Sequence, residues 1–185
     1  MKQKEKLKKL AQAWSEVPVD YLSMSATPIP RSLHMAMSGL RKVSLITTHP
    51  AGRRAVQTRV MRWNDARIRE EILHELRRGG QCFFIHNRVQ SIERVATTLR
   101  TLVPEATFAV AHGQMEDSVL EKTLVEFVRR EHHVLVCTTI VESGVDIPSM
   151  NTILINRADR LGLAQLYQLR GRVGRSTVRG SCTLL

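Results

Sequence analysis

The sequence predicts an α/β fold in which a parallel β-sheet is covered by helices on both faces. From about residue 80 onward, short apolar runs alternate with segments whose apolar residues recur at helical spacing. Each apolar run is continuous rather than alternating, which is typical of strands buried on both faces of a sheet. A regular alternation of strand and helix favours parallel strands joined by right-handed crossovers.

From residue 57 onward, six strands and four helices are expected, and the two kinds of element alternate along most of this part of the chain. The expected strands are QTRVMRW (57–63), CFFIH (82–86), TFAVAH (107–112), HVLVCTT (133–139), TILIN (152–156) and SCTLL (181–185). The expected helices lie around 68–76, 92–99, 120–128 and 163–169. Gly79 and Gly80 are expected to cap the first helix, and Pro104 closes the region of the second.

The first part of the chain is less regular and predicts a domain boundary. The stretch DYLSMSATPIPR (20–31) is typical of a strand that ends in a stiff turn, because each proline fixes its own φ and restricts the residue before it. TTHPAGRRA (47–55) has the composition of a linker. We therefore expect residues 1–46 to be the end of a preceding domain, 47–54 a linker, and 55–185 one α/β domain.

The composition indicates a globular protein with an anionic partner. Hydrophobic residues make up 43% of the 185 residues, and 28 Lys and Arg against 17 Asp and Glu give a net charge of +11. Nucleic acid is the commonest partner of so basic a chain, although a generally solvated basic surface is the alternative. The sequence contains no apolar run near the roughly 20 residues of a membrane span, and no signal peptide is expected.

The cysteines and histidines do not predict a metal site. Cys82, Cys137 and Cys182 each lie inside a strand-like apolar run, and none belongs to a CxxC pair. They are expected to be small buried hydrophobes in a reducing compartment, which favours a cytoplasmic location. The adjacent His132 and His133 are more typical of a loop than of a zinc site.

Polar residues follow several of the expected strands. These groups are His86-Asn87-Arg88, His112-Gly113-Gln114, Thr138-Thr139 and Asn156-Arg157. Ligands of open α/β sheets bind at the carboxyl ends of the strands, so a binding site is expected there.

The octamer QLRGRVGR (168–175) concentrates arginines around two glycines without an acidic neighbour. Gly171 and Gly174 are expected to let the backbone turn, so that Arg172 and Arg175 project together from one edge of the sheet. Preorganised guanidinium groups stabilise charge on a transferring phosphoryl group, an effect worth roughly 10³–10⁵ in rate in known nucleotide hydrolases. A plain patch for phosphate backbone is the equal alternative from this octamer alone.

A second stretch favours a nucleotide site over that alternative. In VLVCTTIVESGVDIPSMNTILI (134–155), a buried strand leads into a polar loop with Thr138, Thr139, Glu142, Gly144 and Asp146. Hydroxyls at a strand end can donate to phosphate, Gly144 allows a ligand close to the backbone, and Asp146 can accept from a sugar hydroxyl. Each feature alone is common in turns, but their order before Gln-x-x-Gly-Arg-x-x-Arg is specific.

Four stretches in the same order resemble motifs III to VI of superfamily-2 helicases and translocases. They are SATPIPR (25–31), HGQM (112–115), TTIVESGVDIP (138–148) and QLRGRVGR (168–175). The resemblance covers essentially the whole chain and is strongest to the group of RecG and Mfd. Three longer stretches resemble the Mfd translocases of transcription-coupled DNA repair more than they resemble RecG. They are PRSLHMAMSGLRKVSLITTHPAGRRAVQT, HGQMEDSVLE and NTILINRADRLGLAQLYQLRGRVGRS.

The resemblance implies a fold and a role for each motif residue. Residues from about 55 onward would form the second RecA-like motor domain, and 1–46 would be the tail of the first. Arg172 and Arg175 would be arginine fingers on ATP, with Gln168 nearby. The further implied roles are nucleotide binding by Glu142, Gly144 and Asp146, DNA-backbone contact by Thr138, Thr139, Asn87, Arg88, His112 and Gln114, and coupling of ATP state to DNA grip by Ser25, Ala26, Thr27 and Arg31.

The implied activity is ATP-dependent translocation on double-stranded DNA, with ATP and Mg²⁺ as cofactors. The sequence has no G-x-x-x-x-G-K-[ST] phosphate loop and no Asp-Glu-x-x strand, so both cofactors would be held mainly by a first motor domain. The isolated chain is therefore expected to be inactive. RNA polymerase and nucleotide-excision repair proteins would be partners of domains outside this sequence. The alternatives are RecG-like fork remodelling and a non-catalytic nucleic-acid-binding half-motor.

Overall fold

The structure is a computed structural model that describes residues 22, 24, 44, 46, 48, 55–139, 147, 149–174 and 178–185. The chain divides into two units, Met1–Ser44 and Leu45–Leu185, and almost all of the first lies outside the described residues. The expected tail domain and linker stay predictions, and Ser25, Ala26, Thr27 and Arg31 lie outside the described residues.

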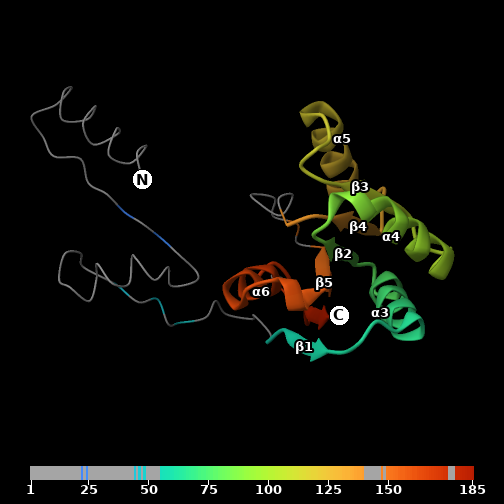
Figure 1. The fold of residues 1–185 in the computed structure, drawn as a ribbon. Helices are drawn as coiled ribbons and strands as arrows, with labels where there is room; N and C mark the ends of the chain where they lie inside the picture. Colours follow the sequence, from blue (N-terminus) through green and yellow to red (C-terminus); the bar gives the residue numbers. More distant parts are fainter. Residues whose placement is uncertain are drawn as a thin grey trace, which may run out of the picture. The chain divides into compact units, whose positions relative to one another are not determined.

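The second unit contains a six-stranded sheet in the order β1-β6-β5-β2-β4-β3 (Figure 1). Every neighbouring pair of strands is parallel, as the alternation of strand and helix predicts. The strands are β1 Gln57–Val60, β2 Gln81–His86, β3 Phe108–Ala111, β4 Val134–Cys137, β5 Met150–Asn156 and β6 Ser181–Leu184. The parallel α/β fold class is confirmed.

The helices lie where the apolar spacing predicts them. They are α3 Asp65–Arg77, α4 Val89–Leu102, α5 Asp117–Val128 and α6 Leu163–Arg170, with a short 3₁₀ helix, η1, at Ala158–Arg160. Gly79 and Gly80 end α3 in a Schellman motif, in which their N–H groups donate to the carbonyls of Leu76 and Glu75. The expected cap is confirmed.

The helices cover both faces of the sheet with two separate cores. Along β2, Phe83 and Ile85 face one core, while Cys82 and Phe84 face the other. The first core packs against α5 and α6 through residues such as Phe127 and Leu169. The second core packs against α3 and α4. Since β2 is buried at every residue, the continuous apolar run of this strand has a structural cause.

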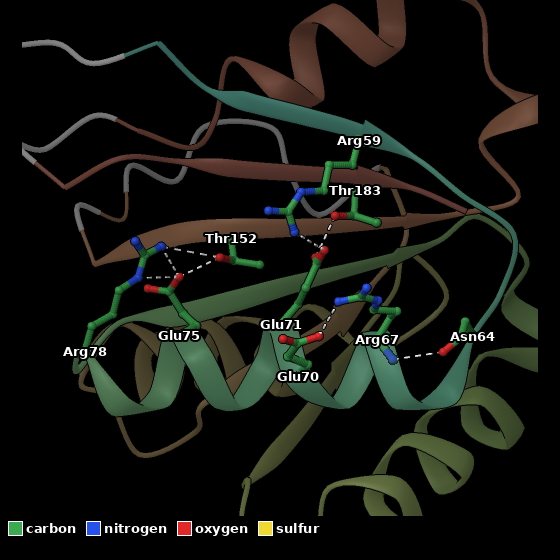
Figure 2. A network of polar contacts seen from close by, with 9 residues as sticks. All are labelled: Arg59, Asn64, Arg67, Glu70, Glu71, Glu75, Arg78, Thr152 and Thr183. Atoms are coloured by element: carbon green, nitrogen blue, oxygen red, sulfur yellow. Dashed lines mark hydrogen bonds and ion pairs between the residues drawn. The ribbon is translucent and has the colours of Figure 1, made fainter.

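A polar network fixes α3 against the strands (Figure 2). Glu75 is completely buried, forms an ion pair with Arg78, and accepts a hydrogen bond of 2.5 Å from the hydroxyl of Thr152. One turn earlier, Glu71 accepts a hydrogen bond of 2.6 Å from the hydroxyl of Thr183. Because Glu75, Arg78 and Thr152 lie close to the starts of β2 and β5, this part of the network marks the amino edge of the sheet.

The cysteines are buried and the two adjacent histidines lie in a loop, as the sequence predicts. Cys82, Cys137 and Cys182 are buried and free of disulfides. His132 and His133 lie in the connection between α5 and β4, as expected of a loop. Within the described ranges no group of His, Cys, Asp and Glu is arranged to hold a metal ion, and no helix is long and apolar enough to cross a membrane.

Candidate nucleic-acid and nucleotide site

Four neighbouring strand ends bring polar residues together along the carboxyl edge of the sheet. The strands β5, β2, β4 and β3 are consecutive in the sheet and run in the same direction. The residues at or directly after their ends therefore form a row, which we call the carboxyl-edge row: Asn156 and Arg157, His86 to Arg88, Thr138 and Thr139, and His112. The predicted gathering of these groups is seen in the structure.

Asn87 and Thr139 contact each other within this row. The hydroxyl of Thr139 donates a hydrogen bond of 3.0 Å to Oδ1 of Asn87, so the ends of β4 and β2 are tied together. Asn87 is exposed and Thr139 is half-buried. Because the carbonyl oxygen of the amide is occupied, its Nδ2 group is the part oriented for an external acceptor such as a phosphate oxygen.

His86 forms a second tie, between the ends of β2 and β5. Its Nδ1 lies 3.0 Å from Nδ2 of Asn156, and its Nε2 lies 2.8 Å from the hydroxyl of Ser91 at the start of α4. Burial, and after it the charges of Arg88 and Arg157, lower the pKa of His86 below its ordinary value. Sequence reasoning counted His86 and Asn156 among the polar strand ends but gave neither an individual role, and it did not single out Ser91. The only signal was the polar residue that closes each apolar run.

Thr138 has a different environment from Thr139. Its side chain is buried, and its hydroxyl has no hydrogen-bond partner in the structure. Its backbone N–H donates 3.3 Å to the carbonyl of Ala111 on the neighbouring strand. A phosphate would reach this hydroxyl only after the residues around it have moved, whereas Thr139 lies at the surface of the row.

The turn after β3 adds His112 and Gln114 at the end of the row. Nδ1 of His112 accepts a hydrogen bond of 3.3 Å from the backbone N–H of Gln114, so the imidazole bonds within the turn that follows β3. The Gln114 side chain is exposed. Both residues thus lie beside the end of β4, as the pairing of β3 with β4 requires.

Two arginines of the row differ in how far they are neutralised. Arg157 is paired with Asp159, whose carboxylate lies 3.1 Å from its Nε, and the pair raises the pKa of Arg157. Arg88 is exposed, and no carboxylate of the described ranges lies within ion-pair distance of it. Arg88 is therefore the stronger candidate for a phosphate contact.

The arginine-rich motif follows α6. Gln168 is exposed, and Arg172 is half-buried without a described carboxylate within ion-pair distance. The guanidinium of Arg170 lies over the ring of Tyr167 at 5.6 Å. Arg172 is thus not neutralised by the part of the chain that the structure describes. Arg175, the second expected finger, lies outside it.

Gly174 shows where this motif lies in the fold. It has a φ of +71°, and a Cβ there would approach Val56 to 3.2 Å, while a Cβ on Gly180 would approach the backbone nitrogen of Gly174 to 2.8 Å. Val56 and Gly180 directly precede β1 and β6, so the end of the motif lies near the amino ends of these strands. Gly171, in contrast, has a right-handed helical φ of −67° and needs no glycine for its backbone angles.

The structure therefore places the expected site residues in two regions. The carboxyl-edge row holds the residues expected to contact nucleic acid, and the Arg172–Gly174 segment lies toward the opposite edge of the sheet. Sequence reasoning placed Arg172 and Arg175 at one edge of the sheet but could not say which edge, because it had no means to locate the segment that follows α6. Glu142, Gly144 and Asp146, expected at the nucleotide, lie outside the described residues.

The parallel sheet with polar groups along its carboxyl edge is typical of an α/β domain that binds a ligand at the ends of its strands. The sequence pattern of the helicase conserved C-terminal domain matches residues 64–177, and the chain belongs to this family. The match spans α3 to α6 and includes the whole carboxyl-edge row.

Several proteins similar to this chain share one name, transcription-repair-coupling factor. The transcription-repair-coupling factor of Myxococcus xanthus is 54% identical over 100% of this chain, which covers 15% of that protein. The factor of Escherichia coli K12 is 54% identical over 85% of this chain, and the match covers 14% of that factor. The factor of Bacillus subtilis is 52% identical over 94% of this chain and is also covered to 14%. The chain thus spans a small part of each of these relatives.

Solved structures agree with this comparison. RecG bound to a three-way DNA junction matches with a TM-score of 0.74 and 37% identity, covering 90% of this chain and 23% of RecG. The second domain of the DEAD-box helicase Mss116p, bound to an RNA duplex, matches with a TM-score of 0.57 and 20% identity over 70% of this chain and 54% of its own. At that identity the second match supports the fold alone.

Proposed function

We propose that this chain is the second motor lobe of an ATP-dependent double-stranded DNA translocase that acts in transcription-coupled DNA repair. The observation that carries the proposal is the 54% identity to a transcription-repair-coupling factor over the whole chain. The net charge of +11 and the carboxyl-edge row are what such a lobe needs to bind a phosphate backbone without reading its sequence. The site of action would be the cytoplasm.

In this proposal the two regions of the site divide the work. Three side chains contact the phosphates of the DNA backbone and not the edges of the bases: Asn87, Arg88 and Thr139. Arg172, which is not neutralised by a described carboxylate, turns toward the phosphates of ATP when the first motor lobe closes. Closure and opening of the two lobes then advance the protein along the duplex, and RNA polymerase and repair proteins would bind other domains.

The described residues fit the triphosphate better than they fit its metal ion. A half-buried guanidinium without a carboxylate partner suits an anion, and bound ATP supplies the energy of the cycle. The described ranges hold no cluster of acidic residues for Mg²⁺. In this proposal the described part of the chain contributes positive charge at the phosphates, and the first lobe would hold the metal ion.

The sharpest test replaces Arg172 in a protein that contains both lobes. Arg172→Ala should lower DNA-stimulated ATP turnover by roughly 10³–10⁵, the usual value of an arginine finger, with DNA affinity within about twofold of wild type. Arg179→Ala is the matched control, because this exposed arginine lies shortly after the motif. Unchanged turnover in Arg172→Ala would remove the finger mechanism.

A RecG-like role on branched DNA is the second candidate, and the match to RecG on a three-way junction favours it. Affinities for a linear duplex and for a three-way junction of equal length distinguish the two. The translocase predicts similar affinities for both substrates. A preference for the junction of tenfold or more would favour the RecG-like role.

A further inference from the structure

We propose that His86 is a positioning residue that holds the DNA-binding loop Asn87-Arg88 in place through one neutral tautomer. The inference deepens the proposed function and rests on it, because it assigns a task within the same DNA-binding row. His86 itself is buried and is not expected to touch the DNA.

The first step is the chain of hydrogen bonds through the imidazole. The amide Nδ2 of Asn156 can only donate, so Nδ1 of His86, at 3.0 Å, accepts from it. The proton of a neutral ring then lies on Nε2, which donates to the hydroxyl of Ser91 at 2.8 Å. That hydroxyl in turn donates to the backbone carbonyl of Arg88 at 3.4 Å. Each hydrogen bond in this series therefore has a defined donor and a defined acceptor.

The second step is that the same loop is tied on its other side. Thr139, at the end of β4, donates to Oδ1 of Asn87 at 3.0 Å. The loop is therefore fixed to β5 through His86 and to β4 through Asn87, on both neighbours of β2 in the sheet. As a consequence, the amide nitrogen of Asn87 and the guanidinium of Arg88 face solvent from a backbone that is held on two sides.

The third step is that the surroundings of His86 oppose its protonation. The charged groups that act on it are Arg88, in the loop, and Arg157, at the end of β5. Both are cationic, and no described carboxylate lies within ion-pair distance of the imidazole. A proton on Nδ1 would also face the amide hydrogens of Asn156, so protonation would break the tie to β5.

The tautomer can be measured on the wild-type chain without any substitution. A long-range proton–nitrogen NMR spectrum at pH 7 should show His86 neutral with its proton on Nε2, and the ring should take up a second proton only below the ordinary histidine pKa. A proton on Nδ1, or an imidazolium at pH 7, would overturn the proposal. This measurement does not depend on DNA binding, so it tests the tie even where the proposed function fails.

The consequence for binding is tested with three variants of the 185-residue chain and a mixed-sequence duplex. His86→Leu should lower affinity threefold or more and make the salt slope of binding shallower by about 0.9, the value of one lost phosphate contact. His86→Gln can both accept and donate, so it should stay within twofold of wild type. The control His74→Leu removes an exposed histidine of α3 and should have no effect.

The outcomes distinguish the positioning role of His86 from DNA binding by the chain as a whole. Wild-type affinity in a folded His86→Leu variant would overturn the positioning role while leaving the proposed function intact. Absence of DNA binding by the wild-type chain itself would instead count against the proposed function. If His86→Leu fails to fold, Ser91→Ala removes the same tie with a smaller change and should show the same loss of affinity and slope.

Discussion

At the scale of single residues, the most consequential side chain outside the candidate site is Glu75. It is completely buried, and its carboxylate accepts hydrogen bonds from three side chains, those of Arg78, Asn151 and Thr152. Gly80 must be a glycine for the same reason, because a Cβ there would lie 1.6 Å from Oε1 of Glu75. The local sequence does not show that Glu75, unlike the exposed Glu70, is buried in a network, since two of its partners, Asn151 and Thr152, lie on the distant strand β5.

Removal of the Glu75 carboxylate should destabilise the fold strongly. Glu75→Ala leaves a guanidinium and a buried hydroxyl without their partner, which costs about 3 kcal/mol in comparable buried pairs. Glu70→Ala is the matched control, because its pair with Arg67 is 65% exposed on both sides and its loss should cost less than about 1 kcal/mol. Urea unfolding of both variants measures the difference. Equal values would show that the network contributes no more than a surface pair.

The lowered pKa of His86 predicts how stability depends on pH. The folded state prefers the neutral imidazole, so protons bind the unfolded chain more tightly. Stability should therefore be highest above the ordinary histidine pKa of about 6.5 and should fall as pH drops through the lower pKa of the folded state. Urea unfolding from pH 7.5 to 5 should show a smaller loss in His86→Gln than in wild type. The same loss in both would mean that other groups dominate.

At the scale of elements, apolar spacing was sufficient to locate every strand and α-helix described between residues 55 and 185, but not the short 3₁₀ helix η1. The strand expected at 57–63 ends at Val60, which is paired with Leu184 of β6. The strand expected from 152 begins at Met150, where pairing with β2 starts. Such ends depend on the neighbouring strand rather than on the local sequence, and for this reason periodicity predicts the elements better than their bounds.

The turn after α6 shows how one glycine places an element. Gly174→Ala requires a left-handed backbone at φ +71° and contacts Val56, so it should cost about 1–3 kcal/mol in unfolding free energy. Gly162→Ala is the comparison, because φ there is −71° and the nearest atom to a new Cβ lies 3.9 Å away. Its loop-entropy and N-cap effects oppose each other and should leave stability within about 1 kcal/mol. A tolerated Gly174→Ala would mean that the turn can adopt another conformation.

At the scale of the whole molecule, the sequence predicted the fold class and the row of polar strand ends, but not the arrangement of the site. The order of strands decides that Thr139 contacts Asn87 and that His86 contacts Asn156. Residues 52 and 70 positions apart thus meet because β4 and β5 both flank β2. Local patterns carry no information on that order, nor on the placement of Arg172 toward the other edge.

The final question at this scale is whether the excess of positive charge or its position binds DNA. Arg88 lies in the carboxyl-edge row, whereas Arg77 lies in the last turn of α3, near the amino edge, and both are exposed. Arg88→Glu and Arg77→Glu change the net charge equally. If the row is the binding surface, Arg88→Glu should weaken duplex binding tenfold or more and reduce the salt slope by about 0.9, while Arg77→Glu should change affinity about threefold at most. Equal losses in the two variants would show that a generally basic surface, and not the carboxyl-edge row, attracts the DNA.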